Sequence, residues 1–105
     1  MSAHDTNLAT EFLLRGYIAR LEDMDALVLN NPHLLLSCLV ARYTDRCHYL
    51  IAKLKWWIAK GGDRALDEAS VWLPAIDSLE RDILGSLDRA EKTAAYKAMI
   101  AARAA

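Results

Sequence analysis

Residues 31–62 read NPHLLLSCLVARYTDRCHYLIAKLKWWIAKGG, a run that predicts one long helix with clear ends. Asn31 is a favourable N-cap, and Pro32 suits the first helical position, where no backbone N–H is needed. Lys60 places a cation in the last turn, and the two glycines that follow it are a helix stop. The sequence therefore predicts a helix over residues 32–60.

This predicted helix has two chemically different long faces. One face is apolar and spans about 120° of arc, as expected of a helix that packs on a core. The other face carries cations and aromatic rings at i, i+4 and i+7 spacing: Arg42, Arg46, Tyr49, Lys53, Trp56 and Lys60. We name these six residues the basic–aromatic stripe. Trp, Tyr and Arg are enriched at the hot spots of protein interfaces, so we predict that the stripe binds a partner. Alternatively, a further helix covers the stripe, and its two rings then belong to the core.

The residues before this helix predict an antiparallel neighbour. Asp5 to Asn7 are plausible N-caps, and an apolar stripe follows them, which predicts a helix over residues 7–29. Its buried residues are expected to be Leu14, Ile18, Leu21 and Val28. The connection to residue 32 is short, and short connections join antiparallel helices.

The residues after the two glycines predict two further helices. Asp63 is a plausible cap for a helix over residues 64–84, in which the apolar residues stay in phase across Pro74. We therefore expect Pro74 to bend this helix, although it could also divide it. The apolar phase changes beyond Gly85, so we predict a break there and an Ala-rich helix over residues 88–103. Asp88 and Glu91 form an approximate capping pair for it.

These elements predict an all-α fold. A chain of 105 residues has room for one domain with a single hydrophobic core, here residues 1–105. We expect a bundle of about four helices, with three long helices and a bend at Pro74 as the alternative description.

Charge is unevenly distributed along the chain. Residues 32–60 carry a formal charge of +4 between flanking segments of −3 and −2, within a total of −1. Nucleic-acid-binding domains usually have a strongly basic balance, so nucleic acid is a less favoured partner than a protein. It stays an alternative because Lys and Arg bind phosphates and exposed rings stack on bases. A third possibility is that acids elsewhere in the fold neutralise the stripe.

The sequence predicts no catalytic residues, metal site or cofactor. It contains no nucleophile, phosphate-loop, dinucleotide or zinc-protease motif. Its histidines, His4, His33 and His48, are scattered, whereas a transition-metal site needs three or four converging ligands. Cys38 and Cys47 are nine residues apart, about 13 Å along a helix, and are expected to be reduced thiols. With neither a signal peptide nor a membrane span, we predict a cytoplasmic protein.

In size and composition the chain resembles small helical proteins that phages and mobile elements use to block host complexes, including anti-CRISPR inhibitors. The resemblance implies steric occlusion of a nuclease effector or of its DNA-binding surface, and it assigns no residue a role. We therefore predict a non-enzymatic protein-binding module, with a monomer slightly favoured. The alternatives are a chaperone or assembly subunit that forms homo-oligomers, and the nucleic-acid binder.

Overall fold

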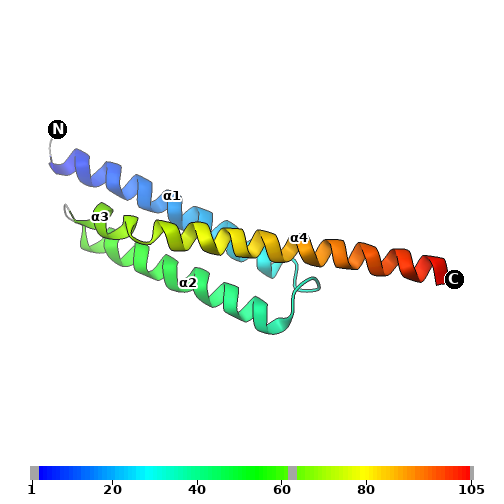
Figure 1. The fold of residues 1–105 in the computed structure, drawn as a ribbon. Helices are drawn as coiled ribbons and strands as arrows, with labels where there is room; N and C mark the ends of the chain where they lie inside the picture. The colour runs from blue at the N-terminus through cyan, green and yellow to red at the C-terminus, as the bar shows by residue number, and fades with distance from the viewer. Residues whose placement is uncertain (1–2, 62–63, 105) are drawn as a thin grey trace.

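The computed structural model describes residues 3–61 and 64–104 and confirms the all-α prediction, because these residues form helices and no strand. The helices are α1 (Ala3–Leu29), α2 (Ser37–Lys60), α3 (Ala65–Ser70) and α4 (Leu73–Ala104). α1 and α2 lie side by side and run in opposite directions, and the first half of α4 packs along them (Figure 1). The second half of α4 continues beyond the bundle, so the molecule measures 70 × 23 × 19 Å.

One hydrophobic core joins α1, α2 and the first half of α4. The four residues predicted to be buried in α1 are buried, and so are the central residues of the other two helices: Leu14, Ile18, Leu21, Val28, Tyr43, Cys47, Leu50, Leu54, Ile76, Leu79, Ile83 and Leu87. The apolar faces predicted for residues 32–60 and 64–84 also include Leu36 and Leu84, and these two are instead exposed, by 70% and 51%.

The predicted start of α2 is wrong. Residues 32–35 form a turn, and α2 begins at Ser37 after Leu36, which has extended dihedral angles. The Asn31 side chain does not cap α2, since its amide nitrogen donates to the carbonyl of Leu27, 2.8 Å away at the end of α1. The turn places Leu35 in the core, which accounts for the interruption. The end of α2 is where we predicted it, at Lys60, and Gly61 follows with a φ of 63°.

The predicted break between Gly85 and Asp88 is also wrong, because α4 is continuous from Leu73 to Ala104. The change of apolar phase has a different cause. Every side chain from residue 91 to 104 is exposed, so no core dictates which side of the helix is apolar. Asp88 does not cap a helix and pairs instead with Lys92, at 3.0 Å.

The chain bends just before Pro74. α3 ends at Ser70, and Val71 and Trp72 form a turn, with Val71 in helical dihedral angles (φ −60°, ψ −27°). Because proline has no N–H to donate to the carbonyl four residues earlier, a helix is weakened at this point. α3 and α4 together make one long bent helical segment, so the structure has three long segments, and the expected count of about four is not confirmed.

The first helix begins earlier than predicted, at Ala3, and Asp5 to Asn7 lie inside it. Acidic residues are favourable in a first turn, so Asp5 is compatible with a helical position there. The proposed cap at Asp63 lies outside the described residues.

An ion-pair cluster fixes α4 against α1. The Arg20 guanidinium donates to both carboxylate oxygens of Glu80, at 3.0 Å each, and to Asp77 at 2.6 Å. The hydrogen bonds from Arg20 lower the pKa of Glu80 below its usual value. This two-point contact is the strongest geometry available to an arginine and a carboxylate.

This contact predicts a dependence of stability on pH. A carboxyl group whose pKa is lowered by folding stabilises the protein above its unfolded pKa, about 4.3, and the contribution disappears as pH falls through the lower folded value. We therefore expect the free energy of unfolding to fall in acid by up to about 1 kcal/mol on account of Glu80, a figure limited by solvent exposure. Chemical denaturation between pH 7 and pH 3 would measure it. Equal acid dependence in the parent and in Glu80→Gln would contradict this account.

Candidate functional site

All six residues of the basic–aromatic stripe are exposed on α2. Tyr49 and Trp56 each keep about half of their surface accessible, 51% and 52%. The alternative, in which a further helix covers these rings, is therefore not found in the described part of the chain. The second half of α4 instead continues beyond the bundle (Figure 1).

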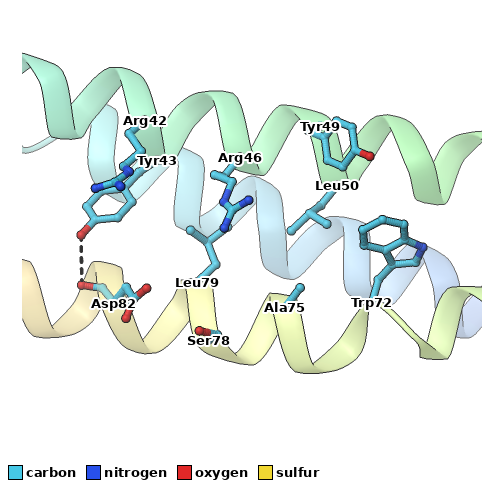
Figure 2. A pocket seen from close by; sticks show the side chains of 10 residues that line it. All are labelled: Arg42, Tyr43, Arg46, Tyr49, Leu50, Trp72, Ala75, Ser78, Leu79 and Asp82. Atoms are coloured by element: carbon cyan, nitrogen blue, oxygen red, sulfur yellow. Dashed lines mark hydrogen bonds between the residues drawn. The ribbon is translucent and has the colours of Figure 1, made fainter.

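A groove of about 290 Å³ lies beside the first half of the stripe, between α2 and α4. α2 contributes Arg42, Arg46 and Tyr49, as Figure 2 shows. The α4 side is lined by three small or polar residues and one leucine, Ala75, Ser78, Asp82 and Leu79, and Trp72 lines it from the turn before α4. We name this space the α2–α4 groove. Lys53, Trp56 and Lys60 do not line it.

The two ends of the groove are built differently. At one end the Tyr43 hydroxyl lies 2.7 Å from the Ser86 hydroxyl and 3.5 Å from the carbonyl oxygen of Asp82, joining α2 to α4. At the other end Tyr49 and Trp72 meet edge to face, with ring centroids 6.0 Å apart. Trp72 belongs to the turn before α4, so the bend near Pro74 brings an aromatic ring against α2.

Lysines of the stripe lie over its aromatic rings. The Lys60 ammonium is 4.7 Å from the centre of the Trp56 ring and 5.4 Å from that of Trp57, and Lys53 is 5.7 Å from Tyr49. Trp56 and Trp57 are themselves edge to face at 4.7 Å. Each exposed cation–π contact is worth about 0.5–1 kcal/mol, so these contacts restrict the rings to a few positions before any partner arrives.

The cations of the stripe form no ion pair with an acid of the described residues. The acids that pair do so elsewhere, Asp77 and Glu80 with Arg20, Glu11 with Arg15, Asp88 with Lys92 and Asp25 with His48. Asp82 lines the groove with Arg42 and Arg46 but lies beyond ion-pair distance from both. Among the described residues, no acid therefore forms the ion pairs that would neutralise the cations of the stripe.

A second polar cluster lies between α1 and α2. His48 Nε2 is 3.1 Å from one oxygen of Asp25, and the other oxygen of Asp25 is buried without a hydrogen-bond partner among the described residues. Burial, helped by the charge of Asp25, raises the pKa of the Cys47 thiol to about 11. Cys47 is therefore a protonated core thiol and not an accessible nucleophile. Among the described residues, no three His, Cys, Asp or Glu side chains converge as metal ligands.

Sequence reasoning missed two members of these sites. Trp72 was assigned no role, although its position two residues before Pro74 marks it as part of a bend. Asp25 was not connected to His48, because the two are 23 residues apart and meet only when α1 and α2 pack. The oxygen partner of His48 is therefore Asp25 on α1, and not Asp45, the acid one helical turn before it on α2.

No protein-family model, curated protein or solved structure matches this chain. None of the described helices combines the length and the apolar character needed to cross a membrane. Functional inference therefore depends on the geometry of the chain itself.

Proposed function

We propose that this chain is a non-enzymatic protein-binding module, and that the basic–aromatic stripe of α2 docks onto an acidic surface of a partner protein. The observation that carries the proposal is an exposed row of four cations and two rings, whose cations have no acidic partner among the described residues. Charges left unpaired in this way are available for complementary pairing, which speeds association and selects an acidic partner.

Trp56 is the proposed anchor of this interface. It is half exposed, it is held by Trp57 and Lys60, and a preorganised ring loses little conformational entropy on binding. Arg46 is one turn from both Arg42 and Tyr49 and offers a planar set of donors to a carboxylate. We propose further that the chain acts as a cytoplasmic inhibitor that occludes a nucleic-acid-handling host complex. Its small size and partner-facing stripe are compatible with that role.

Nucleic acid is the weaker alternative for the same stripe. Base stacking needs an accessible ring face, and here lysines lie over the rings of Tyr49 and Trp56. A nucleic-acid complex would lose affinity steeply with salt, in proportion to the number of phosphates contacted.

Affinity capture tests the proposal. The immobilised parent chain is expected to retain a partner from bacterial lysate that Arg46→Glu and Trp56→Ala retain poorly. Arg15→Glu is the matched control, because Arg15 is an exposed arginine on α1 paired only with Glu11 among the described residues. Capture that is lost equally in the control, or kept in both stripe variants, would contradict the assignment.

A further inference from the structure

The second half of α4 is a helix that has no packing partner in the part of the chain that the structure describes. From residue 91 to 104 every side chain is exposed, including Tyr96, Met99 and Ile100. An isolated helix of about this length is only marginally stable in water, and most helical stability in proteins comes from tertiary packing. A surface that packs on this half of α4 would therefore stabilise it.

The exposed area is large enough for a stable dimer. The chain exposes 7205 Å², whereas a compact monomer of 11.7 kDa is expected to expose about 5,900 Å². The difference, about 1,300 Å², exceeds the roughly 800 Å² that each partner contributes to a standard interface.

Two large side chains of the exposed half of α4, Tyr96 and Ile100, lie on the same side as the α2–α4 groove. Tyr96 follows Ser78 by 18 residues, and Ile100 follows Asp82 by 18 residues, which is five full turns of an α-helix. The side of α4 that forms the groove therefore carries Ala75, Ser78 and Asp82 beside Leu79, and in the exposed half the same side carries Tyr96 and Ile100 beside Lys97. Such a side complements itself when two copies run antiparallel.

We propose that the chain forms a two-fold antiparallel dimer, in which the second half of α4 of each copy lies in the α2–α4 groove of the other. A two-fold interface uses the same patch on both copies, as this side of α4 requires. Tyr96 and Ile100 of one copy then pack on Ala75 and Ser78 of the other, as anchors spaced i, i+4 in a groove. The two-fold axis of the dimer then passes near residue 87 of each α4, midway between residues 78 and 96.

One charge pair agrees with that register, because Asp82 of one copy faces Lys92 of the other. The dimer does not rest on the proposed function, although it shares Arg42, Arg46 and Tyr49 with the stripe. Lys53, Trp56 and Lys60 lie outside the groove, so Trp56→Ala tests partner binding without changing a residue of the dimer interface.

Light scattering after size-exclusion chromatography tests the dimer. The parent chain is expected to have twice the chain mass of 11.7 kDa, and Ile100→Glu is expected to have the single mass. Its helical circular dichroism should fall by no more than residues 91–104 contribute, because the bundle itself stays folded. Ala102→Glu is the matched control, since it adds the same charge two residues away on the opposite side of α4. A parent that is monomeric at all concentrations would overturn the proposal and leave the groove to a different partner. If Ile100→Glu and Ala102→Glu dissociate the dimer equally, the dimer interface is not on the side of α4 that carries Tyr96 and Ile100.

Cross-linking tests the register. In a Cys38→Ser background, Ser78→Cys combined with Tyr96→Cys is expected to oxidise to a covalent dimer. Within one chain these positions are about 27 Å apart along α4, so the disulfide can form only between copies. Ser78→Cys with Ala95→Cys is the control, because Ala95 lies on the opposite side. A dimer that forms no disulfide with the first pair, or forms it equally with the control pair, would overturn the proposed packing.

Discussion

Replacing Leu54 or Ile76 by alanine is expected to lower the free energy of unfolding by about 2–5 kcal/mol. Both side chains are fully buried, Leu54 on α2 and Ile76 on α4, so each substitution removes apolar contacts and leaves a cavity. Small domains are stable by only about 5–15 kcal/mol, so either loss is a large part of the total. The bundle is narrow, so few neighbouring side chains are available to move into the cavity that either substitution leaves.

Chemical denaturation monitored by circular dichroism would measure these losses. Leu84→Ala is the matched control, because Leu84 is on α4 but half exposed, and surface substitutions usually change stability by less than about 0.5 kcal/mol. A Leu84→Ala loss as large as that of Ile76→Ala would show that the outer side of α4 is buried in solution, as it would be in a different assembly.

Trp56→Ala is expected to weaken partner binding by about 2 kcal/mol or more, roughly 30-fold in the dissociation constant. The ring is the largest exposed group of the stripe, and its contacts with Trp57 and Lys60 hold it ready to enter a pocket. Arg46→Glu is expected to cost at least as much, because it replaces an attraction by a repulsion. Since both side chains are exposed, the melting temperature should stay close to that of the parent.

Titration calorimetry with the captured partner would measure both effects. Raising the salt concentration should weaken the parent complex more than the Arg46→Glu complex, because exposed charge pairs are screened by salt. Unfolding of Trp56→Ala would contradict the account, since it would make the ring part of the core.

The helical spacing of apolar residues in the sequence predicted which side chains are buried. Leu14, Leu21 and Val28 repeat at helical spacing, and their burial followed from that repeat. The stop at Lys60 followed from glycine chemistry, because Gly61 has a positive φ, which glycine adopts more readily than other residues. The exposure of Trp56 followed from its angle of 100° to Trp57, which packs against the core.

The errors arose where tertiary packing overrides local preference. Asn31 and Pro32 fit a helix start by themselves, but the core takes up Leu35 and requires a turn first. Gly85 was interpreted as a break because we assumed that every apolar residue after it faces a core. The α2–α4 groove was beyond prediction from sequence, because it depends on how closely two helices separated by a bend approach each other.

Photo-cross-linking from the position of Trp56 tests the central claim most directly. A benzophenone amino acid placed there should form a covalent adduct with the partner protein, and the adduct should contain a protein other than a second copy of this chain. The same group at Phe12, an aromatic position on α1 with 78% of its surface exposed, is the control and should give no adduct. Adducts from Phe12 and none from Trp56 would place the interface on α1 and contradict the assignment of the stripe.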